Sequence, residues 1–337
     1  MHFWLRAESK PFEARTPLTP EGARSLVAAG HQVTVERSPT RVFPDDAYDA
    51  ARLAETGSWP DAPQDAIILG LKELPTQPGT LVHRHILFAH AFKEQAGWRE
   101  LLGRFLDGGG TLYDLEVLED AGRRVAAFGY WAGYAGAAVG ALVHGGHSEP
   151  LVPYASRAAL VDALRGSVGR PDVLIIGAKG RCGRGARALC DDLGLRATEW
   201  DLEETRAGGP FVEILQHELF VNAVLLGGRM PPFLTRAELA RPRRLRVVAD
   251  VSCDPTSPYN PIPIYERTTS FAAPALRVAD DPPLDVVAID HLPSLLPRES
   301  SEDFAAQLLP HLLAFGSPIW QGAARVFEEK TMPLRKS

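Results

Sequence analysis

Short apolar runs alternate with amphipathic stretches along most of this 337-residue chain. In the first half, strand-like runs occupy residues 32–36, 65–71, 85–89 and 111–115, and helical patterns cover 20–29 and 94–106. In the second half, strand-like runs occupy 172–176, 195–200, 219–226, 245–251 and 286–289, and helical patterns cover 186–193, 302–315 and 318–328. Strands alternating with helices are typical of doubly wound parallel sheets. The pattern and length therefore predict an α/β chain with two domains.

One apolar stretch, residues 125–143, runs for 19 residues without a charge and is long enough to cross a bilayer. It contains Gly129, Gly133, Gly136 and Gly140, whose spacing lets two helices approach closely. The segments on both sides have the pattern of ordinary α/β structure. We therefore expect a buried helix packed against another backbone rather than a membrane span.

A glycine-rich turn follows the apolar strand at 172–176. Gly177, Gly180 and Gly183 form G-x-x-G-x-x-G, and Arg181 adds positive charge within it. Such glycines permit a tight turn, close approach of the backbone to a pyrophosphate, and packing of the next helix against the strand. The helix N-terminus then directs N–H groups at the anion. The turn therefore predicts a dinucleotide site, and the alternative is a glycine-rich turn that binds no ligand.

An acidic residue lies where a ribose would be recognised. Asp201 follows Gly183 by 18 positions, at the end of the next predicted strand. A carboxylate there accepts hydrogen bonds from the ribose hydroxyls of NAD and repels the 2′-phosphate of NADP. The preference for NAD is weakened by Arg206, which lies close by in sequence.

The composition narrows the class of protein. The net charge is -6, which disfavours general nucleic-acid binding. The chain has only three cysteines and no apolar leader at its first residues, so we expect a cytoplasmic protein without a disulfide scaffold. Only six of its 36 cations are lysines. A lysine retained among so many arginines is a candidate for proton transfer, because guanidinium does not release its proton near neutral pH.

Titratable side chains follow three predicted strands of the first domain. Lys72 and Glu73 follow the run at 65–71, His90 and Lys93 follow the run at 85–89, and Glu116 follows the run at 111–115. Ligands of open parallel sheets bind outside the carboxyl ends of the strands. Groups gathered there would shift one another's pKa values. The alternatives are a solvated loop lysine for Lys72 and a structural histidine for His90.

Other reactive residues have a weaker pattern. His83 with His85, and His144 with His147, lack cysteine or carboxylate partners at the usual ligand spacing, so we expect no metal site. Cys182 lies in the glycine turn, where a thiolate would be favoured. No base is placed to activate it, and we interpret it as a small packing residue.

Six motifs together resemble one enzyme family, saccharopine dehydrogenase of the NAD-dependent, lysine-forming type. They are LRAE at 5–8, EARTPLTP at 13–20, GLKELP at 70–75, FAHAFKEQAGW at 88–98, RRVAAFGY at 123–130 and IDHLPSLLPRE at 289–299. With the glycine turn, they occur in family order over nearly the whole chain. The family is related in fold to alanine dehydrogenase and to the NAD-binding unit of transhydrogenase.

The resemblance implies two Rossmann-like domains with the active site in a cleft between them. A substrate domain would comprise residues 1–127 and 297–337, and a dinucleotide-binding domain residues 128–296. The glycine-rich helix would cross between the domains. The reaction implied is the reversible conversion of saccharopine, NAD and water into lysine, 2-oxoglutarate and NADH.

The resemblance also implies roles for individual residues. Lys72 would be the base that takes the amine proton, and His90 the acid–base group for imine hydrolysis, with Glu73 and Glu116 tuning their pKa values. The residues implied to bind substrate carboxylates are Arg15, Lys93 and Arg124. Those implied on the cofactor side are Gly177, Gly180, Arg181, Gly183, Asp201 and Asp290.

Several features leave the physiological substrates open. The chain is shorter than its fungal counterparts, and Ala223 stands where a cysteine is expected, which makes a disulfide with Cys182 doubtful. One alternative is an opine-type reductive aminase that joins another amine and keto acid. Another is a non-catalytic NAD-binding regulator, although such a regulator has no need of the lysine and histidine. The expected partners are small-molecule substrates, without nucleic acid or membrane, and the oligomeric state stays open.

Overall fold

The computed structural model describes residues 1–92 and 97–336. The chain divides into two compact units. Unit 1 comprises Met1–Ala127 and Ser300–Ser337, and unit 2 comprises Phe128–Glu299. Each unit is built around one six-stranded sheet. Among the described residues, no helix combines the length and apolar character that a bilayer span requires.

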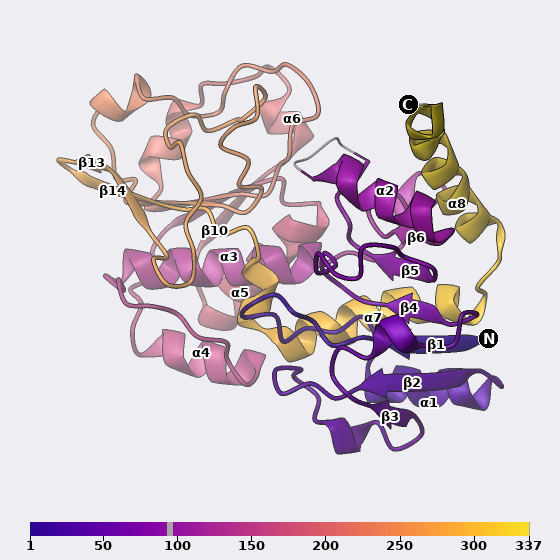
Figure 1. The fold of residues 1–337 in the computed structure, drawn as a ribbon. Coiled ribbons are helices and arrows are strands. Elements are labelled where there is room, and N and C mark those ends of the chain that lie inside the picture. The colour runs from indigo at the N-terminus through magenta and orange to yellow at the C-terminus, as the bar shows by residue number, and fades with distance from the viewer. Residues whose placement is uncertain (93–96, 337) are drawn as a thin grey trace. The chain divides into compact units, whose positions relative to one another are not determined.

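The sheet of unit 1 has all its strands parallel and the order β3-β2-β1-β4-β5-β6 (Figure 1). Its strands are β1 (His2–Leu5), β2 (Gln32–Glu36), β3 (Arg52–Ala54), β4 (Ile67–Leu69), β5 (Arg84–Leu87) and β6 (Thr111–Asp114). The strand order reverses between β1 and β4, which are hydrogen-bonded neighbours. In doubly wound sheets this reversal leaves a crevice outside the strand ends, where ligands bind.

Helices and a small ribbon complete unit 1. They are α1 (Pro20–Ala28), α2 (Trp98–Gly108), α7 (Pro297–Leu313), α8 (Pro318–Thr331) and the antiparallel pair β7 (Glu119–Asp120) and β8 (Arg123–Arg124). The core between the sheet and the helices combines aliphatic and aromatic side chains. The rings of Phe105 on α2 and Phe327 on α8 lie 5.8 Å apart, and Figure 1 shows these two helices side by side. The final helices of the chain thus pack onto its first sheet.

The sheet of unit 2 has the order β10-β9-β11-β12-β14-β13. Its strands are β9 (Val173–Ile176), β10 (Ala197–Trp200), β11 (Leu219–Asn222), β12 (Val247–Asp250), β13 (Leu276–Asp280) and β14 (Pro283–Val287). The helices of the unit are α3 (Gly129–His144), α4 (Arg157–Arg165), α5 (Arg181–Leu193) and α6 (Leu202–Thr205). Five strands are parallel, as predicted, but β13 pairs antiparallel with β14 at one edge.

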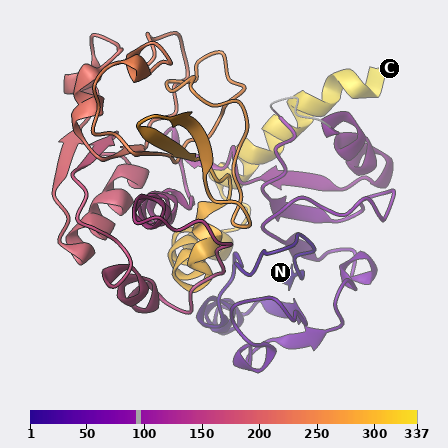
Figure 2. The ribbon, with the colours of Figure 1, turned by 90° about the vertical axis from the view of Figure 1, so that its left-hand side faces the viewer.

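The apolar stretch forms the buried helix α3, as expected. Figure 2 looks nearly along its axis. A Cβ on Gly133 would lie 1.7 Å from the carbonyl oxygen of Cys182 on α5. A Cβ on Gly185 of α5 would lie 1.8 Å from the backbone carbonyl oxygen of Tyr130 on α3. The two helices therefore touch backbone to backbone, which only glycine permits at these two positions. The helix lies wholly within unit 2, so the expectation that it crosses between the domains was wrong.

Short helical turns connect these elements. They are the 3₁₀ helices η1 (Asp45–Ala47), η2 (Trp59–Asp61), η3 (Val212–Gln216), η4 (Glu238–Ala240), η5 (Leu292–Leu295) and η6 (Met332–Lys336). The predicted helix at 186–193 begins earlier than expected, at Arg181, because Gly180 takes the extended N-cap conformation directly after the turn. The predicted helix at 94–106 is described from Trp98 onward, after a left-handed Gly97. The sequence pattern missed β1, β3, β7, β8, β13, α4 and α6.

Candidate functional site

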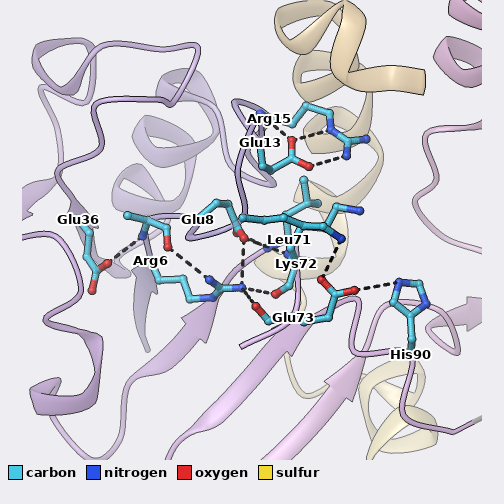
Figure 3. A network of polar contacts seen from close by, with 11 residues as sticks. Arg6, Glu8, Glu13, Arg15, Glu36, Leu71, Lys72, Glu73 and His90 are labelled. Carbon is cyan, nitrogen blue, oxygen red and sulfur yellow. Dashed lines mark hydrogen bonds and ion pairs between the residues drawn. The ribbon is translucent and has the colours of Figure 1, made fainter. Parts of the chain in front are cut away.

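Lys72 and Glu73 lie at the reversal of strand order in unit 1, directly after β4. Figure 3 shows the polar network around them. Glu8, which follows β1, accepts hydrogen bonds from the backbone N–H groups of Leu71 (2.6 Å) and Lys72 (3.1 Å). The end of β4 is therefore tied to the end of β1, and the lysine is held at the crevice that this topology creates.

Lys72 has the surroundings of a lysine that can release a proton. Burial lowers its pKa, and the positive charges of Arg15 and Lys10 lower it further, while the Glu13 carboxylate acts in the opposite direction. A lysine with a lowered pKa can exchange its proton nearer neutral pH than a solvated one. Its environment thus favours the proton-transfer interpretation over a solvated loop lysine.

His90 follows β5 and lies between two carboxylates. Its Nδ1 is 3.3 Å from Glu116 Oε1, and its Nε2 is 4.0 Å from Glu73 Oε1. The hydrogen bond with Glu116 raises the pKa of His90, burial opposes this, and the charges of Glu116 and Glu73 add to the increase. The backbone of His90 has φ 53, a left-handed conformation that is uncommon outside glycine. Such strain at a polar residue is typical of functional sites.

The charge of Glu73 acts on both Lys72 and His90. Burial acts to raise its pKa, but its own backbone N–H and the charges of Lys10, Lys72 and His90 give a net lowering. Its carboxylate is 3.6 Å from the ammonium nitrogen of Lys10 and reaches toward His90 (Figure 3). The structure therefore brings together Lys72, Glu73, His90 and Glu116, four residues that the sequence placed after three separate strands.

The predicted carboxylate binders lie in different surroundings. Arg15 is 4% exposed and makes a bidentate pair with Glu13, with Nε–Oε1 at 2.8 Å and Nη2–Oε2 at 2.6 Å. Burial acts to raise the pKa of Glu13, but Arg15 and Lys72 outweigh it and lower that pKa. Arg124 lies in β8. Lys93 lies outside the described residues.

A pocket of about 250 Å³ opens beside His90. Its described lining combines acidic, apolar and basic side chains: Glu73, Leu74, Thr76, Ala89, His90, Gly97, Trp98, Glu100, Leu101 and Arg104. Arg104 is fixed there by hydrogen bonds from its Nε and Nη2 to the Pro78 carbonyl oxygen, at 3.1 and 2.8 Å.

The glycine turn in unit 2 has the geometry of a phosphate cradle. Gly177 has φ 88, and a Cβ there would lie 2.7 Å from Val224 Cγ2. A Cβ on Gly183 would lie 2.1 Å from the Gly177 carbonyl oxygen, so the helix packs directly onto the turn. Helix α5 begins at Arg181, and a helix N-terminus presents N–H groups and positive partial charge to an anion. These residues fit the pyrophosphate of a dinucleotide.

Asp201 directly follows β10 and is hydrogen-bonded to the same turn. Its carboxylate accepts the Lys179 N–H at 2.8 Å and the Leu202 N–H at 2.9 Å, and the first of these lowers its pKa most. The residue also forms the capping box of α6 with Glu204. Asp201 therefore keeps its negative charge next to the cradle. Asp290 is exposed in the segment after β14.

The sequence reasoning missed a buried carboxylate at the end of β12. Asp250 is 2% exposed and accepts hydrogen bonds from Tyr265 Oη at 2.7 Å and Asn222 Nδ2 at 2.9 Å. It also accepts the Ser252 and Cys253 N–H groups, each at 3.2 Å. The signal was present in the sequence, since Asn222 and Asp250 are polar residues that end apolar strands. This network holds the segment after β12 at the same sheet edge as the glycine turn.

The residues considered for metal or thiol chemistry are placed otherwise. Within the described part of the chain, no group of three His, Cys, Asp or Glu side chains could hold a metal ion. His83 bonds to the Ala62 carbonyl oxygen through Nε2 at 3.0 Å. All three cysteines are free, and burial raises the pKa of the Cys182 thiol, so the helix N-terminus does not produce a thiolate there.

Known proteins are similar to this sequence over nearly the whole chain. Residues 4–135 match the model of the alanine dehydrogenase/PNT N-terminal domain. The chain is 48% identical to a saccharopine dehydrogenase [NAD(+), L-lysine-forming] of Emericella nidulans, over 98% of this chain and 97% of the relative. It is 46% identical to the enzyme of the same name from Schizosaccharomyces pombe, over 99% of each chain.

The fold has a counterpart among solved structures. A structure of L-alanine dehydrogenase superposes with a TM-score of 0.70 at 18% identity, over 98% of this chain and 94% of that one. This likeness confirms the Rossmann-like α/β architecture. The sequence relatives, similar from end to end, settle the family: the chain belongs to the saccharopine dehydrogenases of the NAD(+)-dependent, L-lysine-forming type.

Proposed function

We propose that this protein is an NAD-dependent saccharopine dehydrogenase, which converts saccharopine, NAD⁺ and water reversibly into L-lysine, 2-oxoglutarate and NADH. The observation that carries the proposal is that unit 1 contains two candidate proton carriers whose pKa values are shifted in opposite directions. The pKa of Lys72 is lowered by burial, and that of His90 is raised by Glu116. Groups whose pKa values move toward neutrality serve as acids and bases at working pH.

The two groups act on different steps. NAD⁺, when bound, supplies the acceptor for the hydride that leaves the substrate carbon. Lys72 takes the proton from the secondary amine during that transfer, which leaves an imine of the substrate. His90 removes a proton from the water that attacks the imine, and then assists the collapse of the carbinolamine to lysine and 2-oxoglutarate. Glu116 raises the pKa of His90 mainly through its hydrogen bond, and the charge of Glu73 acts to raise the pKa values of both carriers.

Positive side chains bind the carboxylates of the substrate. We assign this role to Arg15, Lys93 and Arg124, because charge-assisted hydrogen bonds both bind and orient a carboxylate. The bidentate pair with Glu13 fixes the guanidinium plane of Arg15. Arg15 thereby combines binding with its effect on the pKa of Lys72.

Unit 2 binds the dinucleotide and unit 1 supplies the proton-transfer groups. In this proposal Gly177, Gly180, Arg181 and Gly183 surround the pyrophosphate, Asp201 accepts the ribose hydroxyls, and Asp290 contributes on the cofactor side. The closely packed turn and the retained charge of Asp201 support this assignment. Three free thiols fit a reducing compartment, and we place the enzyme in the cytoplasm.

The test is NADH oxidation with 2-oxoglutarate and a panel of amines that includes lysine, ornithine and alanine. The proposal predicts the highest kcat/KM with lysine. A clear preference for another amine would identify an opine-type reductive aminase instead. NADH binding without oxidation in the presence of any amine would identify a regulator.

A further inference from the structure

The backbone of residues 71–73 is held from two directions by one ion pair (Figure 3). Glu8 accepts the N–H groups of Leu71 and Lys72. Arg6 donates from Nη2 to the carbonyl oxygens of Lys72 and Glu73. Four backbone polar groups of residues 71–73 therefore bond to two side chains from the segment that follows β1.

The pair is deeply buried and closely packed. The Arg6 and Glu8 side chains are 0% and 6% exposed, and their charged atoms lie 3.2 Å apart. A Cβ on Gly70 would lie 2.3 Å from Arg6 Nε, so only glycine at the end of β4 leaves room for the guanidinium. Buried ion pairs are poor evidence for stability, because desolvation offsets their attraction. Their hydrogen bonds nevertheless fix geometry.

The pair is itself anchored to the sheet. Ala7, between Arg6 and Glu8, donates its N–H to Glu36 Oε2 at 2.8 Å. Glu36 is fully buried at the end of β2 and also accepts the Gly57 and Trp59 N–H groups. The segment that carries the pair is thus fixed between β2 and β4, so it provides a rigid support for residues 71–73.

We propose that Arg6 and Glu8 are positioning residues, which hold the Lys72 backbone so that its Nζ meets the substrate amine. This inference rests on the proposed role of Lys72 as the base. Arg6 and Glu8 direct their polar atoms at backbone groups of residues 71–73, so they act through Lys72 and not on the substrate. A misplacement of about 1 Å at a reacting group can cost about 10²-fold in rate.

A double-mutant cycle tests the inference. Glu8→Gln keeps one oxygen acceptor but places an NH₂ group against the other amide, and it removes the charge opposite Arg6. We expect the single-turnover rate of NADH oxidation with lysine and 2-oxoglutarate to fall about 10–100-fold. In a Lys72→Met background, Glu8→Gln should leave the already reduced rate nearly unchanged, because nothing remains to be positioned.

The outcomes separate this inference from the proposed function. Equal fold-losses in both backgrounds would mean that Glu8 supports the fold generally and would overturn the positioning role, with the Lys72 assignment intact. A normal rate for Lys72→Met alone would overturn that assignment, and the inference with it. Arg6→Lys provides a second cycle if Glu8→Gln does not fold, because an ammonium group cannot reproduce the guanidinium fork.

Two controls accompany the cycle. Glu21→Gln removes an exposed carboxylate on α1 that pairs only with surface Arg24 among the contacts described, and should leave the rate unchanged. NADH titrations by fluorescence should give the same dissociation constant for wild type, Glu8→Gln and Glu21→Gln. A loss of NADH binding in Glu8→Gln would contradict an action limited to Lys72.

Discussion

At the scale of single residues, the site gives two titratable side chains opposite surroundings. His90 is surrounded by carboxylates that favour its charged form, and Lys72 by burial and cations that favour its neutral form. Composition singled out Lys72, and strand-end placement singled out His90. The sequence could not show how Arg6 and Glu8 act, because their partners are backbone groups of residues 71–73, which the strand order brings close.

Glu116 should control the pH dependence of the rate through His90. Because Glu116 raises the pKa of His90, Glu116→Gln should lower it, and the limb of the rate profile that depends on charged His90 should move to lower pH. The charged pair should stabilise the fold below a pH of about 6.5, and this contribution should be lost as pH rises through the folded-state pKa.

The measurement is the pH profile of kcat for the two proteins, with chemical unfolding at several pH values. Glu119→Gln, on the exposed β7 ribbon, is the matched control. An unchanged profile for Glu116→Gln would show that His90 does not carry that limb.

Asp201 should select the cofactor. Its carboxylate stays charged beside the glycine turn, so it should repel the 2′-phosphate of NADPH, and kcat/KM should be higher with NADH. Asp201→Asn should narrow the ratio between the two cofactors. Asp191→Asn, on the exposed face of α5, should not change it. Equal use of both cofactors by the wild-type protein would remove this role from Asp201.

At the scale of elements, the position of the glycine turn depends on the contact between α3 and α5. The sequence predicted the buried helix and the close approach that its glycines permit. It did not identify α5 as the partner, because residues near 133 and 182 meet only in the folded unit. The edge strand β13 was missed for a related reason, because its antiparallel pairing with β14 forms only in the folded unit.

Gly133→Ala should destabilise unit 2 and disturb the turn. The added Cβ would meet the backbone of Cys182 at 1.7 Å, so the helices must separate. Overpacking of this kind typically costs about 1–3 kcal/mol. Urea unfolding measures the loss, and a weaker affinity for NADH should accompany it, because α5 begins at the glycine turn.

The control is Gly103→Ala on α2, where an added Cβ meets nothing within 4 Å. That substitution should leave the protein equally or slightly more stable, by about 0.4–1 kcal/mol. Similar stabilities for the two variants would show that the contact between α3 and α5 tolerates a methyl group.

At the scale of the whole molecule, the chain contains two sheets of six strands each, to which we assign different tasks. The alternation of apolar and polar residues was sufficient to predict two parallel α/β sheets. Strand order was not predictable from it, since the same alternation is compatible with many topologies. The reversal between β1 and β4 is what places the segments after residues 5 and 69 together, and thereby builds the surroundings of Lys72.

The central claim is that Lys72 transfers a proton, and Lys72→Arg tests it most directly. Arginine keeps the positive charge but does not release its proton at working pH. The measurement is the single-turnover rate of NADH oxidation with lysine and 2-oxoglutarate, for wild type, Lys72→Arg and Lys72→Met. We expect both variants to be slower by roughly 10²–10⁴-fold while NADH binding is retained. A near-wild-type rate for Lys72→Arg would show that residue 72 supplies only charge, and would contradict this account.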